Sequence, residues 1–343
     1  MNPPIRILIP LALASFLLGS GACHREAYSP EKAAFAKGMD LIMQEQAGYR
    51  NETRRLYNDQ KFDELEARAN EARSTQAKFG NGTWKLTSFY DSLTCREEEP
   101  EAMWLLHEQI HQDWEKKFPA SITARVAHAD FLTSYAWHAR GTGYANEVTE
   151  DGWRLFRERL AAAKTTLDQS KSLPIQCPAW WQVQMKVALG QAWNKTDFTK
   201  LFEEAKSFEP KYFKYDFAQA KFLMPRWYGE PGDWESAAEK EIDRPNGLGL
   251  EGYARVISEQ RGYYDDIFEE TKASWRKTQQ GFELMSKNHP DSAEILNAYT
   301  RLACIAEDRP LAKKLFEKIG DKVIIYCWGE RKRFTQLKYW ANH

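Results

Sequence analysis

A five-residue motif carries the most specific chemistry that this sequence suggests. Residues 107–111 are His107-Glu108-Gln109-Ile110-His111, which fits the pattern HExxH. On a helix, two histidines four residues apart can bind one Zn²⁺, and the glutamate between them can activate the metal-bound water. His107 and His111 as ligands, with Glu108 as the base, therefore define a zinc-peptidase hypothesis.

The periodicity around this motif argues against a zinc site. Apolar side chains recur at the spacing of one helix face, at Met103, Leu106, Ile110, Trp114 and Phe118. His107 and His111 then fall on the flank of that face, and Glu115 is expected to pair with His111 one turn away. No third-ligand motif, GxSxG or P-loop is present. We therefore expect no catalytic residues, metal or cofactor, and keep the zinc peptidase as the alternative.

Two aromatic runs, at residues 136–145 and 225–234, form the second candidate site. Each places a tryptophan beside an arginine, followed by a glycine-bearing turn. The residues that would line a pocket for an acidic or sugar-like group are Trp137, Arg140, Arg226, Trp227 and Tyr228. In the alternative that we favour, the arginines cap helix carbonyls or pair with an acid such as Asp233, while the indoles fill grooves between helices.

The first residues resemble an export signal. Arg6 precedes an apolar run at residues 7–18, which is too short to span a bilayer, and small residues lead up to Cys23. This arrangement predicts a signal peptide over residues 1–22 and a lipidated Cys23. Ordinary signal-peptidase cleavage before Cys23, giving a secreted protein, is the alternative. Residues 23–28 are then a short tether, and residues 29–343 form a single helical domain.

The remaining cysteines have no metal-binding spacing. They are Cys95, Cys177, Cys304 and Cys327. In an exported protein they can form one or two disulfides or stay as buried thiols, and the sequence leaves both the pairing and this choice open.

Composition limits the classes of partner. The 343 residues contain 48 Lys and Arg against 49 Asp and Glu, a net charge of -1, and mean hydropathy is -0.67. Nucleic-acid binding needs a surplus of basic residues, so we expect no nucleic-acid partner. We expect membrane contact only through the N-terminal lipid anchor. The 13 tryptophans and only 19 glycines are typical of packed helices.

The hydrophobic pattern predicts helices along the whole chain. Their expected ranges are 30–48, 52–78, 99–117, 121–140, 149–170, 179–193, 197–208, 211–224, 233–241, 264–287, 291–306 and 308–319. Glycine, proline and asparagine fall between them. The fold class is therefore predicted to be all-α.

Degenerate repeats point to a tetratricopeptide-like (TPR-like) α-solenoid. Residues 198–210 carry Phe198, Phe202 and Ala205 at the spacing of such a repeat, and Ala312 and Phe316 recur similarly. In these repeats a small residue lets two helices approach and a bulky one fills the space above it. A solenoid of this kind has one continuous core and a long binding surface.

Several stretches resemble an uncharacterised, mainly bacterial family catalogued as domain of unknown function 4034. The similar segments are residues 136–145, 149–160, 225–234 and a C-terminal stretch ending at Trp328-Gly329. The resemblance covers roughly residues 60 to 340 and implies a helical, TPR-like protein without implying an activity. We therefore expect an exported scaffold of the cell envelope that binds a protein or an envelope component. Glycan binding through a tryptophan-lined groove is a further alternative.

Overall fold

The computed structural model describes residue 35 and residues 38–343. These residues form seventeen α-helices and no β-strand, with one isolated bridge between Lys78 and Trp84. The predicted all-α fold class is therefore confirmed. The predicted leader at residues 1–22, Cys23 and the tether at residues 23–28 lie outside the described residues.

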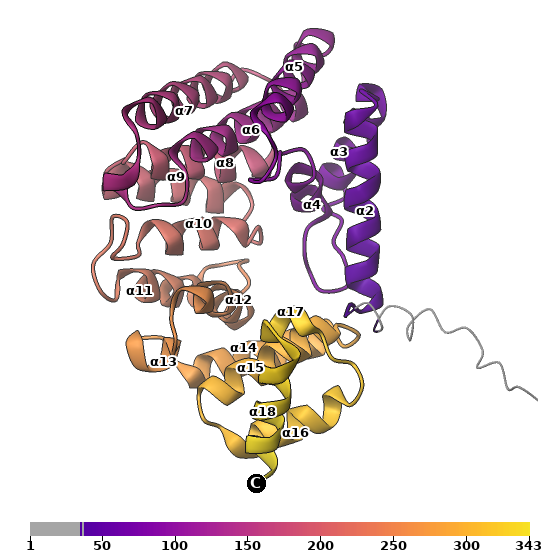
Figure 1. Cartoon of the computed structure of the whole chain (residues 1–343), viewed down its shortest axis with the longest axis vertical. Coiled ribbons are helices and arrows are strands. Elements are labelled where there is room, and N and C mark those ends of the chain that lie inside the picture. Colours follow the sequence, from indigo (N-terminus) through magenta and orange to yellow (C-terminus); the bar gives the residue numbers. More distant parts are fainter. Residues whose placement is uncertain (1–34, 36–37) are drawn as a thin grey trace, which may run out of the picture.

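The first six helices form the N-terminal part of the structure. They are α2 (Leu41–Asn58), α3 (Phe62–Ser74), α4 (Lys85–Asp91), α5 (Glu101–Lys117), α6 (Ile122–Arg140) and α7 (Glu150–Ser170). Figure 1 shows α2 standing upright beside the other helices, with α3 and α4 next to it. Helices α2 to α4 therefore form a side layer along the long axis of the molecule.

The other helices follow one another down the long axis (Figure 1). They are α8 (Pro178–Gly190), α9 (Lys195–Phe208), α10 (Lys214–Phe222), α11 (Asp233–Lys240), α12 (Leu250–Gln260), α13 (Ile267–Glu270), α14 (Trp275–Asn288), α15 (Ala293–Ile305), α16 (Arg309–Ile319), α17 (Ile325–Trp328) and α18 (Arg331–Asn342). Short 3₁₀ helices lie at Ala145–Glu147, Glu241–Asp243 and Arg261–Tyr263.

Side-chain caps fix where several helices begin. The Asp40 carboxylate accepts a hydrogen bond from the Met43 amide at 2.7 Å, and the Ser121 hydroxyl accepts one from Ala124 at 3.0 Å. The Asn194 side chain does the same for Asp197. Each cap satisfies an amide that has no partner within its helix.

The interior consists of three buried clusters that share bordering side chains. Trp137 and Trp180 pack against both the first cluster, around α2 to α8, and the third, around α8 to α10. Phe217 and Trp227 join the third cluster to the second, which extends to α18. The tryptophans with almost no exposed surface are Trp84, Trp104, Trp114, Trp234 and Trp328. Packing therefore accounts for much of the high tryptophan content.

The loop at residues 80–82 fixes the side layer to the distant C-terminal helices. The Asn81 side chain donates to Glu294 of α15 at 2.8 Å and accepts from Gln46 of α2 at 3.2 Å. Arg255 of α12 donates to the Asn81 carbonyl at 2.9 Å. Helices α2 to α4 thus face the inner side of the stack and are held there at more than one level.

The buried face of α5 includes Ile110 and Trp114, as predicted, but is rotated away from Leu106. Leu105 and Leu106 are 55% and 49% exposed, whereas Trp104, His107 and His111 are buried. Ring contacts explain the rotation, because Trp104 stacks on Tyr135 with centroids 5.1 Å apart. Large planar side chains bury more surface against α6 than the leucines would.

No helix among the described residues is long and apolar enough to cross a membrane.

Candidate functional site

The structure brings the two predicted aromatic runs together through their indoles. Trp137 of α6 meets Trp227, which follows α10, edge to face with centroids 5.7 Å apart. Trp137 also contacts Phe156 of α7, and the Tyr228 hydroxyl donates to the Leu189 carbonyl at 2.9 Å. These rings fill the space between helices, which is the packing role that we favoured from the sequence.

The two arginines of these runs do not converge on a common site. Arg140 donates to the carbonyls of Gly141 and Gly143, at 3.1 and 2.7 Å, and so closes the end of its own helix. Arg226 is exposed, with its guanidinium over the Tyr263 ring at 5.6 Å. Asp233 pairs with Lys195 at 2.7 Å and not with either arginine. Of the predicted set, only Arg226 remains available to a partner.

The second run also contains an obligatory glycine. A Cβ on Gly229 would lie 1.8 Å from the Leu223 carbonyl oxygen, so the chain can fold back onto α10 only with glycine there. The amide of Tyr228 then reaches the Phe222 carbonyl at 3.1 Å. The signature of this segment therefore reflects a tight turn.

The HExxH histidines lie in the protein interior. His111 has no exposed surface, and its ring packs against His128 and Phe131 with centroids 5.7 and 4.9 Å away. A catalytic zinc needs an open coordination position facing a substrate cleft, and this location offers none. No group of three or more His, Cys, Asp or Glu that could hold a metal occurs in the described part of the chain. The geometry thus gives the zinc-peptidase alternative no support.

The expected pairing of Glu115 with His111 is wrong. Glu115 binds α6 instead, through Arg125 at 2.8 Å and His128 Nδ1 at 2.9 Å. Desolvation lowers the pKa of His107 to about 4 and that of His111 well below its usual range. The rotation of α5 turns His111 into the core. Glu115 lies beside α6, where it meets Arg125 and His128.

The four described cysteines are free thiols. Cys177, Cys304 and Cys327 are buried and Cys95 is half-buried. Burial raises the pKa of Cys95, Cys304 and Cys327 to about 12, so these groups stay protonated at neutral pH. Of the two possibilities left open by the sequence, the structure shows the thiol form.

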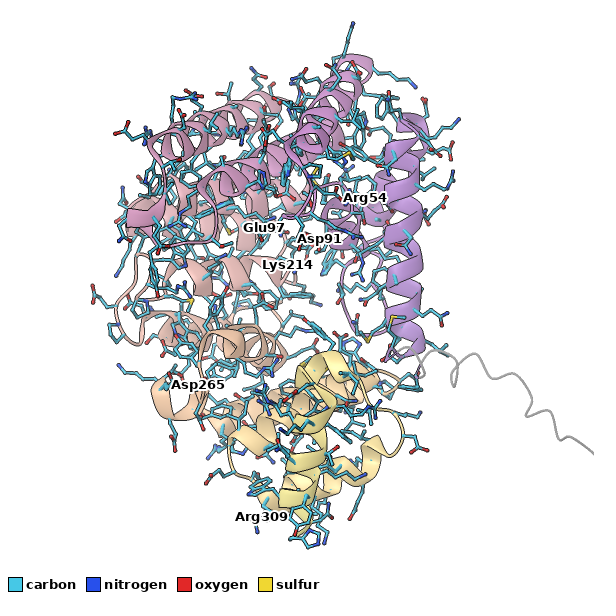
Figure 2. All side chains as sticks on the ribbon, viewed as in Figure 1. Arg54, Asp91, Glu97, Lys214, Asp265 and Arg309 are labelled. Carbon is cyan, nitrogen blue, oxygen red and sulfur yellow. The ribbon has the colours of Figure 1, made fainter. Side chains whose placement is uncertain are left out.

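A set of charged side chains on facing helices forms a different candidate site, which the sequence did not single out. We call it the inner charged cluster, and its members are Arg50 of α2, Asp91 of α4, Asp130 of α6, Lys186 of α8, and Lys214 and Lys221 of α10. Figure 2 shows Asp91 and Lys214 between the side layer and the stack, with Arg54 and Glu97 close by. Five helices thus contribute charges to one region.

Helix geometry places the basic members on this inner side. Lys214 and Lys221 are seven residues apart, which is two turns, so both extend from the same face of α10. Neighbouring Tyr215 and Phe222 are buried and fix the orientation of that helix. Asp91 ends the short helix α4, which the buried Phe89 and Tyr90 fasten to the core.

Most of this cluster is not internally neutralised. Lys186 pairs with Asp130 at 2.7 Å. The other four members make no side-chain hydrogen bond or ion pair with any residue that the structure describes: Arg50, Asp91, Lys214 and Lys221. Three of these four groups are basic, in a chain whose overall charge is close to zero. The named cluster therefore has four basic members against two acidic ones.

The pKa shifts in this region are consistent with charges that act on each other. Desolvation raises the pKa of Asp91 even though Lys214 and Lys186 act to lower it. Asp91 keeps solvent-exposed surface. Protein atoms surround it on its other sides, and they account for the desolvation that raises its pKa. Desolvation, together with the charges of Lys186 and Arg226, lowers the pKa of Lys221. An anionic partner would relieve this crowding of positive charge.

The members of this cluster were missed because each is an ordinary charged residue in the sequence. Only their convergence from five helices distinguishes them, and no local motif encodes it. Arg226 is the one predicted residue whose charge reaches this region, through Lys221. Comparison of the chain with models of protein families, with curated proteins and with solved structures finds no match to any of them.

Proposed function

We propose that this chain is an exported, lipid-anchored, TPR-like protein that binds an acidic segment of a partner protein at the inner charged cluster. The observation that carries the proposal is a set of three basic side chains without ion-pair partners, Arg50 of α2 and Lys214 and Lys221 of α10, whose charges act on one region. Complementary charge steers a partner to such a surface and sets its orientation. The protein would then act as a scaffold and not as an enzyme.

Packing of the predicted repeat residues supports the solenoid part of this proposal. Ala205 and Ala312 are buried, as are the bulky residues Phe202 and Phe316 near them. Helices α8 and α9 lie next to each other, as do α15 and α16, as repeat units require. The side layer stands beside the stack (Figure 1), and solenoids commonly bind extended segments along one side of the stacked helices. Membership of the family of unknown function 4034 stays a prediction.

Reversing two inner charges should weaken binding of an acidic probe. We expect a fluorescently labelled, glutamate-rich peptide to bind the purified protein at low ionic strength, and anisotropy should show at least about tenfold weaker binding to Lys214→Glu/Lys221→Glu. Added salt should weaken the wild-type interaction, because it screens exposed charges.

The matched control reverses two exposed lysines elsewhere. Lys313→Glu/Lys314→Glu on α16 changes the net charge by the same amount, so a loss of binding equal to that of the inner variant would show that only total charge matters. Failure of the wild-type protein to bind the peptide at low ionic strength would argue against an acidic partner.

The lipid anchor has its own test. A fatty-acid analogue fed to expressing cells should label the wild-type protein, and Cys23→Ser should abolish the label because the acyl chains require that thiol. Equal labelling of both proteins would show that the acyl chains are attached elsewhere. An unlabelled wild-type protein that is exported would favour ordinary signal-peptidase cleavage.

A further inference from the structure

Three arginines converge beside the short helix α17, near the C-terminal end of the stack (Figure 1). They are Arg261, in the 3₁₀ helix after α12, Arg301 of α15 and Arg333 of α18, and we call them the arginine cluster. None of the three makes a side-chain hydrogen bond or an ion pair with any residue that the structure describes. Three guanidinium groups from separate elements are therefore left for another partner.

The packing of α17 on α15 places two of these arginines at one turn. The Asn297 side chain of α15 accepts a hydrogen bond from the Trp328 indole at 2.8 Å, which fixes α17 on this face of α15. Arg301 follows Asn297 by four residues, about one helical turn, so its side chain extends from the same face. A Cβ on Gly329, the residue after Trp328, would lie 3.6 Å from a terminal nitrogen of Arg333. Arg333 thus folds back over the turn between α17 and α18.

Electrostatic interactions join the third arginine to this pair. Arg301 is half-buried, and its pKa is lowered to about 10 by desolvation and then by the positive charges of Arg333 and Arg261. Arg261 also acts on Tyr326 and Cys327 of α17. The fold therefore holds three like charges close enough to repel one another.

A ligand in solution can reach the arginine cluster. Arg333 is exposed, and Arg261 keeps part of its surface open. Among the Arg301 nitrogens only Nε is buried without a partner in the described part of the chain, so the two terminal nitrogens reach solvent. Tyr326 is 77% exposed, and its hydroxyl has no hydrogen-bond partner among the described residues, so it offers a further donor at this turn.

The acids nearby do not neutralise the arginine cluster. Glu294 and Glu259 both act on Tyr326. Glu294 already accepts a hydrogen bond from Asn81 at 2.8 Å, and Glu259 is exposed and forms no ion pair with any described residue. The three guanidinium groups thus keep their terminal N–H donors for a ligand.

We propose that the arginine cluster binds a phosphate group. A guanidinium group is planar and donates two parallel hydrogen bonds to a pair of oxygens. A phosphate ester carries up to two negative charges and three strong acceptor oxygens, which suits several arginines better than the two oxygens of one carboxylate. The cluster shares no residue with the inner charged cluster, so either proposal can fail without the other.

Thermal unfolding of the purified protein in inorganic phosphate tests this proposal. At an ionic strength held constant with chloride, phosphate should raise the melting temperature saturably because it binds the folded state, and acetate should raise it less. Arg333→Gln should move the half-saturating phosphate concentration at least about tenfold higher. In chloride alone this variant should not lower the melting temperature, since it removes one of three like charges, whereas a purely structural arginine would lose stability.

Vesicles distinguish the two sources of a phosphate group. The full-length Cys23→Ser protein is mixed with vesicles of phosphatidylglycerol, so that no acyl chain on Cys23 contributes to binding. Co-sedimentation that is lost in Cys23→Ser/Arg333→Gln would assign the phosphate to a lipid headgroup. Stabilisation by inorganic phosphate without co-sedimentation would assign it to a soluble phosphate ester.

Another arginine of α18 provides the matched control. Arg331→Gln removes the same charge from an exposed position on the same helix, but Arg331 lies two residues from Arg333 and so extends from the opposite side. It should leave the phosphate titration unchanged, as should Lys214→Glu/Lys221→Glu. No stabilisation of the wild type by phosphate, an equal effect of acetate, an unchanged titration in Arg333→Gln, or the same shift in Arg331→Gln would each overturn the proposal.

Discussion

Lys206→Met should destabilise the protein by about 3–5 kcal/mol, because it leaves a buried carboxylate without its counter-ion. Lys206 of α9 is only 3% exposed, and its ammonium group lies 2.9 and 3.1 Å from the two Asp216 oxygens. It also donates to the Pro210 carbonyl at 2.8 Å. Chemical denaturation at neutral pH, followed by circular dichroism, measures the loss.

The pH dependence of that loss identifies its cause. Desolvation raises the pKa of Asp216 to about 6 even with Lys206 present, and removing the lysine should raise it further. A carboxyl whose folded-state pKa exceeds its unfolded value destabilises above the folded pKa, and this penalty falls as the pH is lowered. The difference in stability between wild type and Lys206→Met should therefore shrink toward pH 5.

Two variants control for other effects of this substitution. Lys195→Met removes an exposed pair with Asp233 and should cost no more than about 1 kcal/mol. Lys206→Met/Asp216→Leu removes both buried charges and should recover much of the lost stability. An equal loss in Lys195→Met, or no recovery in the double variant, would contradict the account of a buried ion pair.

Mild acid should destabilise the wild-type protein through the buried histidines of α5. The pKa of His107 is lowered to about 4 by desolvation and by the charge of Arg54, and desolvation lowers the pKa of His111 well below the usual 6.5. The folded protein then binds fewer protons than the unfolded chain below pH 6.5, so stability falls as the pH falls. His107 should contribute about 2 kcal/mol of loss between pH 7 and pH 5, and His111 should add to this loss in the same direction.

Denaturation of His111→Phe over the same pH range isolates this effect. The phenyl ring can keep the contacts with His128 and Phe131 and cannot take up a proton, so stability should fall less between pH 7 and pH 5 than in the wild type. His343→Phe, at an exposed position, should leave the dependence unchanged. An unaltered slope in His111→Phe would mean that the acid sensitivity has another origin.

Hydropathy alone identified only part of the buried face of α5, namely Ile110 and Trp114, and the reason is physical. Counting apolar residues placed Leu106 inside, whereas the packed helix buries Trp104 and His107 and leaves the leucine exposed. Stacking of rings across α3, α5 and α6 outweighs the transfer free energy of a leucine. A neutral imidazole can lie in a core, which a scale that treats histidine as polar does not represent.

Helix boundaries were predicted well where capping residues and proline coincide, and poorly elsewhere. The segment predicted at 233–241 matches α11, but the helix predicted over 52–78 is divided at residues 59–61, where Gln60 has a φ of 53°. Helices α4, α12 and α18 were missed because their sequences are short or carry glycine and charge. Packing against neighbouring helices stabilises such segments, and local propensity does not report it.

The inner charged cluster and the arginine cluster share one reason for being missed. Each depends on residues from three or more helices that are far apart in the sequence. The predicted tryptophan–arginine runs are easy to recognise in the sequence. In the structure, however, Trp137 and Trp227 pack between helices and Arg140 closes the end of its own helix. Site chemistry in this fold arises from convergence, which only the tertiary structure shows.

Site-specific photo-crosslinking in living cells tests the central claim, that the inner charged cluster holds a partner protein. A photoreactive amino acid placed at position 214 should form an adduct with one protein, and mass spectrometry should locate it in an acidic segment. The same amino acid at position 313 should form no such adduct. If no adduct forms at position 214, or if the same adduct forms at both positions, the result would contradict a binding surface on the inner side of the stack.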